Sequence, residues 1–257
     1  MKVVLFCGGQ GTRLREYSGT VPKPLVPIGH QPILLHLMRY YAHFGHTEFV
    51  LCLGYGGEMI RQFFMGYDAR NSEDFVMDQG RSKLRLPTSD VLDWKIHFVD
   101  TGVKANVGER LVAVRDLVAD EELFLANYSD QLTDMDLNVF LAWRAERDPV
   151  ASFLAVRPSQ TFHIVGAAED GQVESFRPAR EAGLRINGGF MALKPSVFEY
   201  IRPGEELVEQ PLARLIDRGE AVAYRYDGFW KAMDTYKDKV EFDSLDDHRE
   251  RPWMVWR

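Results

Sequence analysis

Three glycines within four residues follow an apolar stretch at the start of the chain. Residues 2–7 have the composition of a buried strand, and the run Gly8–Gly11 comes directly after it. Because glycine has no side chain, such a loop lets backbone N–H groups close around phosphate oxygens. Arg13 adds a planar fork of donors, and Lys23 adds a second cation between two prolines. This combination predicts a strand followed by a loop that binds a nucleoside triphosphate.

Two commoner glycine-loop motifs do not fit this spacing. A dinucleotide fingerprint needs a third glycine where Leu14 stands and an acidic residue about 20 positions later, but residues 20–47 contain no Asp or Glu. A Walker-type loop ends in Gly-Lys-Ser/Thr, whereas Lys23 lies between two prolines. A simple strand-to-helix turn would explain the glycines alone. The nearby Arg13 and Lys23 make that reading the less favoured one.

Strand-like and helix-like stretches alternate through the first half of the chain. Such alternation predicts an α/β fold of Rossmann-like type, with a mostly parallel central sheet flanked by helices. After about residue 150 the pattern becomes richer in strands. The expected strands lie near 2–7, 48–53, 95–99, 122–126, 150–156, 162–167, 171–176 and 184–193, and the expected helices near 31–44, 57–65, 107–118, 208–218 and 235–246.

The chain shows no linker, repeat or charge block at which it could be divided. We therefore expect one domain over residues 1–257, with a nucleotide-binding part over about 1–150 and an acceptor part over about 151–240. A C-terminal helix and tail would occupy 235–257. In the helix expected near 31–44, apolar and aromatic residues recur at helical spacing, which predicts core packing.

Composition excludes several classes of function. The formal net charge of −7 leaves no basic surplus for nucleic acid or acidic membranes, so phosphate binding has to be local. The two cysteines, Cys7 and Cys52, are too few for a disulfide framework and are expected to be small buried residues. The sequence has no apolar span of membrane length, and residues 1–7 lead into the glycine loop. We expect a cytoplasmic protein.

Residues that directly follow strands are the best candidates for a site, because open α/β sheets bind ligands at the carboxyl ends of their strands. Asp130 follows the apolar run 123–126. A carboxylate there can hold Mg²⁺, which takes one or two protein carboxylates together with waters and phosphate oxygens. A helix cap or solvated turn is the alternative for Asp130, and it is the expected role of the neighbouring Asp134, Asp136 and Asp238.

The run Gly-Gly-x-Gly-Thr-Arg-Leu with the later Pro-Lys-Pro resembles the signature of the sugar-phosphate nucleotidylyltransferases. These enzymes make nucleoside-diphosphate sugars from a sugar 1-phosphate and an NTP. Further runs resemble the glucose-1-phosphate cytidylyltransferase branch, and together the matches extend from residue 2 to about 240. They are found at 29–34, 52–55, 99–102, 186–190, 228–230 and 233–235.

The resemblance implies a GT-A-like fold, Mg²⁺ as cofactor, and a homo-oligomer. It also implies in-line attack by glucose 1-phosphate on the α-phosphorus of CTP, with release of pyrophosphate. Arg13 suits the β- and γ-phosphates because its planar fork binds bidentately, and Lys23 suits the α-phosphate as a compact charge. Another NTP or sugar phosphate stays open as an alternative.

Site residues are carried over position by position. The implied catalytic residues are Arg13 and Lys23, and the implied metal ligands are Asp130 and Asp234. The nucleotide side comprises Gly8, Gly9, Gly11, Thr12, Arg13, Lys23, Tyr55, Gln79 and Arg81, and the sugar-phosphate side comprises Tyr128, Arg177, Asn187 and Gly188.

Three positions depart from the family pattern. Gln79-Gly80-Arg81 stands where Glu-Asn-Arg is expected, and Phe176-Arg177-Pro178 stands where Glu-Lys-Pro is expected. Ser129 replaces the glycine before the first metal aspartate. These departures leave the base and the sugar phosphate open. They also keep a second class of function open, a nucleotide-sugar-binding regulatory protein without transferase activity, although the charged residues that the chemistry needs are all present.

Two other features have less specific meaning. His36, His43 and His46 lack the spacing of a metal motif, so surface or partly buried histidines are expected. The tail 251–257 is unusually aromatic. It is expected either to pack back onto the parent domain or to dock on a neighbouring subunit.

Overall fold

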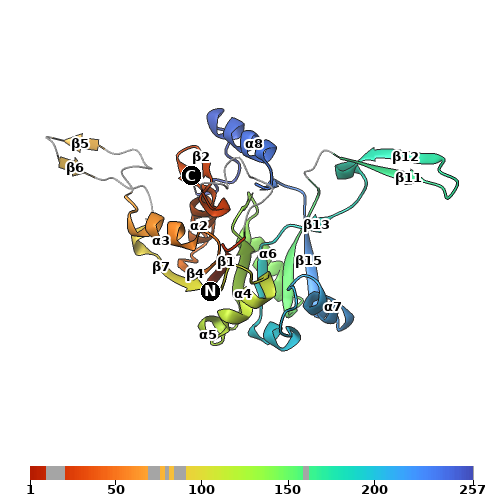
Figure 1. The fold of residues 1–257 in the computed structure, drawn as a ribbon, viewed down its shortest axis with the longest axis horizontal. Helices are drawn as coiled ribbons and strands as arrows, with labels where there is room; N and C mark the ends of the chain where they lie inside the picture. Colours follow the sequence, from red (N-terminus) through yellow and green to blue (C-terminus); the bar gives the residue numbers. More distant parts are fainter. Residues whose placement is uncertain (10–20, 69–75, 79–80, 84–90, 159–161, 257) are drawn as a thin grey trace.

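A computed structural model describes residues 1–9, 21–68, 76–78, 81–83, 91–158 and 162–256. Its centre is an eight-stranded sheet that draws strands from both halves of the chain (Figure 1). The strands are β1 (Val3–Phe6), β4 (Glu48–Leu53), β7 (Lys95–Asp100), β8 (Phe124–Tyr128), β10 (Ala151–Val156), β13 (Ile186–Asn187), β14 (Met191–Leu193) and β15 (Ala221–Tyr226).

Most neighbouring strands in this sheet run in the same direction. Strands β8, β1, β4 and β7 are parallel in that order, with Val4 opposite both Val50 and Ala126. Strand β14 is antiparallel to β8 and to β10, and β15 is parallel to β10. The mostly parallel sheet predicted from the alternating pattern is therefore confirmed, with the β13–β14 segment as its reversed strand.

Helices cover both faces of the sheet and form two apolar cores. Successive residues of β1 point to opposite faces, so Leu5 belongs to one core and Phe6 to the other. The first core packs against α2 (Ile33–His43), α3 (Gly57–Met65), α6 (Leu137–Ala145) and α8 (Tyr236–Asp247). The second packs against α4 (Val107–Ala113), α5 (Arg115–Val118), the 3₁₀ helix η6 (Pro195–Tyr200) and α7 (Gln210–Asp217).

In the described part of the chain, four short antiparallel pairs lie outside the central sheet, together with three short 3₁₀ helices. The pair β11–β12 and the pair β5–β6 extend from opposite ends of the molecule in Figure 1. The pairs are β2 (Pro27–Ile28) with β3 (Gln31–Pro32), β5 (Val76–Asp78) with β6 (Arg81–Lys83), β9 (Gln131–Thr133) with β16 (Trp230–Ala232), and β11 (His163–Ala167) with β12 (Val173–Pro178). The 3₁₀ helices are η2 (Lys23–Leu25), η4 (Val91–Asp93) and η5 (Ala179–Glu181).

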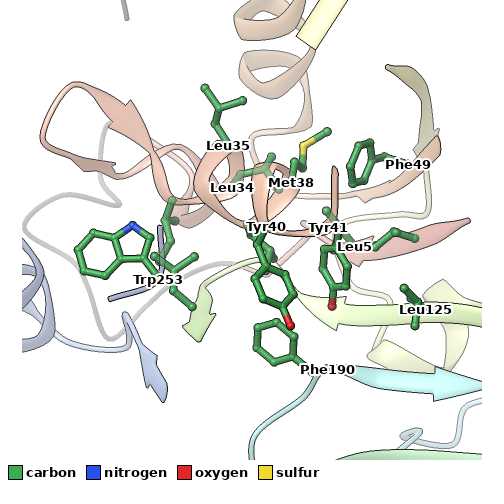
Figure 2. Close-up of a cluster of buried hydrophobic side chains, with 14 of the residues drawn as sticks. Leu5, Leu34, Leu35, Met38, Tyr40, Tyr41, Phe49, Leu125, Phe190 and Trp253 are labelled. Carbon is green, nitrogen blue, oxygen red and sulfur yellow. The ribbon is translucent and has the colours of Figure 1, made fainter. Parts of the chain in front are cut away.

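Helix α2 supplies the aromatic centre of the first core. The side chains of Tyr40 and Tyr41 are 1% exposed and contact Phe190 from the strand-rich half, as Figure 2 shows. The Tyr40 hydroxyl donates to the Met135 carbonyl at 2.8 Å. The prediction that this aromatic stripe packs in the core is confirmed.

The aromatic tail packs onto its own chain. Trp253 is completely buried, and its indole N–H donates to Nδ1 of His36 at 3.3 Å. Because indole nitrogen only donates, Nδ1 must accept, and the His36 proton lies on Nε2, which faces the Ile28 carbonyl. Trp253 also packs edge-on against Phe242 of α8. The tail is thus part of the first core.

The two cysteines agree with the sequence expectations, whereas the three histidines agree only in part. Cys7 and Cys52 are both free and buried, and they belong to opposite cores. His43 is exposed and His46 is partly buried, but His36 is 4% exposed, so the expectation of a surface or partly buried side chain was wrong for His36. Within the part of the chain that the structure describes, no helix is long and apolar enough to span a bilayer.

Candidate active site

The loops that follow β1 and β8 meet at one edge of the sheet and enclose a cavity of about 290 Å³. Because β1 and β8 are parallel neighbours, their carboxyl ends lie side by side. Both ends of the chain line the cavity, which includes Gly8, Gly9, Lys23, Tyr128, Asp130 and Asp234. Residues expected on the nucleotide side, the sugar side and the metal site therefore share one space.

Lys23 is the centre of this group of charges. It is the first residue of η2, and its side chain is 14% exposed. Its Nζ lies 2.5 Å from Oδ2 of Asp130 and 2.7 Å from Oδ1 of Asp234. One ammonium thus holds two carboxylates that come from distant parts of the sequence.

The two carboxylates also decide the charge state of Lys23. Burial by itself lowers the pKa of a lysine, but Asp130 and Asp234 outweigh it and raise the Lys23 pKa above its ordinary value. The side chain is therefore a full cation at neutral pH. Two carboxylates at one point are also a donor set that Mg²⁺ takes, with waters and phosphate oxygens as its other ligands.

Backbone pairing brings the two aspartates together. Asp130 lies in the turn between β8 and β9, and its carbonyl accepts from the Met233 N–H at 2.9 Å. Strands β9 and β16 pair next to this bond, which places Asp234 beside Asp130. Among the described residues no cluster of three or more His, Cys, Asp or Glu side chains is arranged to hold a metal. The Asp130–Asp234 pair is thus a two-carboxylate arrangement.

The neighbouring acidic residues have other partners. Asp136 caps the N-terminus of α6, and Asp238 forms a capping box with Thr235 at the start of α8. Asp134 accepts a hydrogen bond from the Tyr226 hydroxyl. The structural roles that the sequence predicted for Asp136 and Asp238 are confirmed.

Ser129 forms a hydrogen bond to the neighbouring strand β1. Its side chain is buried, and its hydroxyl donates to the Phe6 carbonyl at 2.9 Å. This bond joins the turn after β8 to the last residue of β1. The serine therefore contributes a link between the two loops that carry the site.

Two charged residues that line the cavity were not found from the sequence. Arg110 of α4 is 4% exposed, and Glu206 comes from the loop before α7. Arg110 follows Val107 by three positions on the apolar side of its helix, and this spacing is a signal that could have identified it as inward-facing. Glu206 stands in an irregular loop with no periodic pattern, so the sequence carries no comparable signal.

The expected sugar side lies beside the cavity, where the β13–β14 strand is interrupted. Asn187 Nδ2 lies 3.5 Å from the Tyr128 hydroxyl, and the Trp230 indole donates to the Gly188 carbonyl at 2.8 Å. Buried Asn127 supports the interruption, because its Oδ1 accepts from the Phe190 N–H at 3.0 Å. Burial raises the pKa of Tyr128 to about 12, with smaller contributions from nearby carboxylates, so its hydroxyl stays protonated.

The nucleotidyl transferase family model matches residues 2–238 of this chain. The chain belongs to the nucleotidyl transferase family. It is 34% identical to a Bacillus subtilis (strain 168) protein named as a probable glucose-1-phosphate cytidylyltransferase, over the full length of both. It is 36% identical to the glucose-1-phosphate cytidylyltransferase of Salmonella typhi, again over both full lengths.

Solved structures show the same fold at lower identity. A UDP-glucose pyrophosphorylase in complex with UDP-glucose aligns with a TM-score of 0.70 and 14% identity, covering 97% of this chain and 99% of that one. The expected nucleotidyltransferase fold is thereby confirmed. At this level of identity the likeness establishes the architecture, and the site has to be argued from the residues of this chain.

Several expected site residues of this nucleotidyl transferase lie away from the cavity. Tyr55 is 39% exposed, and its N–H donates to the Gly8 carbonyl at 3.3 Å. Arg177 is exposed on the β11–β12 hairpin, opposite Ile164, and does not line the cavity. Its side chain is thus not brought to the other predicted residues. Outside the described residues lie Gly11, Thr12, Arg13 and Gln79, and only the backbone of Arg81 is described, in β6.

Proposed function

We propose that this chain transfers the cytidylyl group of CTP to glucose 1-phosphate, which yields CDP-glucose and pyrophosphate. The observation that carries the proposal is the full-length similarity, at 34–36% identity, to proteins named for this activity. The convergence of Lys23, Asp130 and Asp234 in one cavity supports it, because these charges suit the handling of two phosphate esters.

The reaction needs no covalent intermediate on the protein. A phosphate oxygen of the sugar 1-phosphate attacks the α-phosphorus of CTP and forms a new P–O bond. The bond from that phosphorus to the α,β-bridging oxygen breaks in line, and pyrophosphate leaves with the electron pair. The tasks of the protein are to bring two polyanions together and to stabilise charge in the transition state.

Named residues take these tasks in our proposal. Lys23 contacts the α-phosphate, since its ammonium is buried at the cavity floor and stays protonated. Arg13 holds the β- and γ-phosphates by its planar fork, and this assignment rests on the family motif. Gly8 and Gly9 line the same cavity and offer backbone groups to the nucleotide.

Asp130 and Asp234 would hold Mg²⁺, because their carboxylates already converge on a single cation. When bound, the metal neutralises phosphate charge and orients the triphosphate. Tyr128, Asn187 and Gly188 form the sugar side in this proposal, supported by the contact between Asn187 and Tyr128. The geometry gives no comparable support to Arg177.

A substrate screen tests the proposal. The purified protein is incubated with Mg²⁺, each of the four NTPs and a panel of sugar 1-phosphates, and pyrophosphate release is measured. The expected result is the highest kcat/KM with CTP and glucose 1-phosphate. A higher value with another pair would reassign the substrates. Nucleotide binding without release in every pairing would favour the non-catalytic regulatory protein.

Three wider assignments remain proposals. We propose one domain over residues 1–257, supported by the sheet that joins both halves of the chain. A homo-oligomer is supported by exposed apolar side chains on the β11–β12 hairpin, such as Phe176 at 64% and Val173 at 59%. Size-exclusion chromatography with light scattering measures the subunit number. A cytoplasmic location accords with the supply of NTP there.

A further inference from the structure

Arg110 is a buried arginine that joins the ends of three neighbouring strands. Its Nη1 donates to the Leu53 carbonyl at 3.1 Å and to the Thr101 hydroxyl at 2.7 Å. Its Nη2 donates to the Gly8 carbonyl at 3.1 Å. Leu53 ends β4, Thr101 follows β7 and Gly8 comes shortly after β1, so one guanidinium connects the carboxyl edge of three parallel strands.

Two glycines make room for this side chain. A Cβ on Gly8 would collide with the Arg110 guanidinium, and a Cβ on Gly54 would lie 2.8 Å from its Nη1. The guanidinium therefore packs directly against the backbone of the loop after β1 and of the loop after β4. Any residue larger than glycine at either position would displace it.

The start of helix α4, which carries Arg110, is fixed by contacts with the second half of the chain. Helix α4 begins with a capping box made by Asn106 and Glu109. The Asn106 amide also donates to the Gly204 carbonyl at 3.0 Å, and Glu206 accepts from the Val107 N–H at 3.2 Å. The helix start is thus held from two sides, which leaves the guanidinium little freedom to move with the loops.

The charge of Arg110 has no counter-ion of its own. Among the described residues no carboxylate lies within 4 Å of the guanidinium, and the groups that accept its hydrogen bonds are two carbonyls and a hydroxyl. Burial lowers the Arg110 pKa, and the more distant carboxylates Asp100 and Glu109 oppose this shift only in part, although an arginine remains protonated in proteins. An unpaired buried charge is destabilising. Arg110 lines the cavity, where a polyphosphate would approach it.

We infer that Arg110 is a positioning residue for the nucleotide: it sets the spacing of the loops after β1 and β4, and its uncompensated charge favours the bound triphosphate. The inference rests on the proposed function of the cavity as an NTP site. It goes beyond the loop motif, because Arg110 stands far outside Gly8–Leu14 in the sequence.

Steady-state kinetics of Arg110→Gln and Arg110→Lys test the inference, with CTP and glucose 1-phosphate varied separately. We expect Arg110→Gln to raise the KM for CTP by about tenfold or more, in line with the loss of charge-assisted hydrogen bonds. Arg110→Lys keeps the charge but loses the fork, so a smaller rise is expected. The KM for glucose 1-phosphate should stay within about twofold. An unchanged KM for CTP, or equal rises for both substrates, overturns the inference.

Arg144 provides a matched control. It is 5% exposed, its guanidinium donates to the Pro149 carbonyl, and burial lowers its pKa in the same way, but it lies 4.0 Å from the exposed Asp148 carboxylate and does not line the cavity. Arg144→Gln should lower thermal stability and leave both KM values unchanged. If Arg110→Gln fails to fold, Thr101→Val provides a second test, because it removes one acceptor of the Arg110 guanidinium. An increase of about two- to fivefold in the KM for CTP is then expected, and no increase overturns the inference.

Wild-type turnover, measured in parallel, separates the two claims. An inactive wild type contradicts the proposed function. If the wild type is active and the Arg110 variant has an unchanged KM for CTP, only the positioning role is contradicted.

Discussion

Lys23 and Asp234 are 211 positions apart in the chain, and their side chains meet at 2.7 Å. The bond closes the N-terminal loop region against the segment that precedes the last helix, and Asp130 completes the arrangement from the middle of the chain. Two carboxylates so close together would repel each other without a shared cation. The lysine therefore keeps the two carboxylates together without a bound substrate.

Lys23→Met should reduce turnover by about 100-fold or more, because it removes a buried cation from the site of charge development. The measurement is kcat with saturating CTP, glucose 1-phosphate and Mg²⁺. Lys95→Met is the control, since Lys95 is 66% exposed and pairs with Glu48 at the far end of the strands. Near-normal turnover of Lys23→Met would contradict its proposed contact with the α-phosphate.

Asp130→Asn and Asp234→Asn should each raise the Mg²⁺ concentration needed for half-maximal turnover by about tenfold or more. Chelation of the wild type should abolish turnover, and added Mg²⁺ should restore it. Asp136→Asn is the matched control, because asparagine and aspartate cap a helix equally well. Identical Mg²⁺ titrations for Asp234→Asn and the wild type would remove Asp234 from the metal site.

Gly189→Ala should impair the sugar side. Gly189 has a φ of +66°, and a Cβ there would collide with Asn127 and lie 2.5 Å from Oε1 of Gln131. We expect a several-fold rise in the KM for glucose 1-phosphate, together with about 1–2 kcal/mol of backbone strain. Gly219 also has a positive φ, of +71°, but open space surrounds it. Gly219→Ala should therefore lower stability and leave the KM for glucose 1-phosphate unchanged. Equal kinetics for the two variants would count against the proposed sugar side.

His36 should make stability depend on pH. Burial lowers the His36 pKa to about 4, assisted by Arg39 and Arg251 and opposed by the hydrogen bond to Ile28. Since an unfolded histidine has a pKa of about 6.5, the unfolded chain binds a proton that the folded chain does not between about pH 6.5 and about pH 4. The free energy of unfolding should therefore fall by about 3 kcal/mol as pH falls through that window.

Urea unfolding at several pH values measures this effect. His36→Gln does not titrate, so the dependence of its unfolding free energy on pH should be shallower. His46, whose pKa burial also lowers to about 4, contributes the part that remains. His43→Gln changes an exposed ring and should leave the profile as it is. A parallel profile for His36→Gln and the wild type would be the contrary outcome.

Trp253→Ala should lower the free energy of unfolding by about 3–5 kcal/mol, because a large aromatic side chain leaves a cavity in the first core. Trp256→Ala, at a partly buried site in the same tail, should have a smaller effect. Chemical denaturation of both variants tests this. Equal effects would mean that the tail is held as a whole and not by the Trp253 contact.

The periodic elements were predictable from the sequence, whereas the short pairings were not. The helix expected at 57–65 is found as α3 (Gly57–Met65), and the strand at 48–53 as β4. The helix expected at 107–118 is divided at Val114, and the strand at 184–193 is interrupted at Gly188–Phe190. The expectations omitted β15 and the short pairs β2–β3, β5–β6 and β9–β16. For β9 and β16, segments of three residues are too short for a periodic signal.

The site residues were likewise predictable only in part. The loop motif identified Lys23, the strand-end argument pointed to Asp130, and the family resemblance pointed to Asp234. The pairing of β9 with β16 then brings the two aspartates together. Arg110 was missed because a single charge within an apolar helical face resembles an exposed one when read along the sequence. Arg177 was placed by analogy, but it does not line the cavity, and its hairpin extends from one end of the molecule in Figure 1. The backbone path of a hairpin depends on tertiary contacts that a short motif does not encode.

The reversed strand β14 joins the nucleotide half of the sheet to the acceptor half by unbroken hydrogen-bonded pairing. Rotation of one half against the other would break that pairing and bend two packed cores. We therefore expect the sheet edge that carries Gly8, Tyr128 and Asp130 to keep its shape during the proposed reaction. For an engineer, the acceptor loops are then the segments to exchange when a different sugar is wanted, and the floor residues are the ones to leave alone.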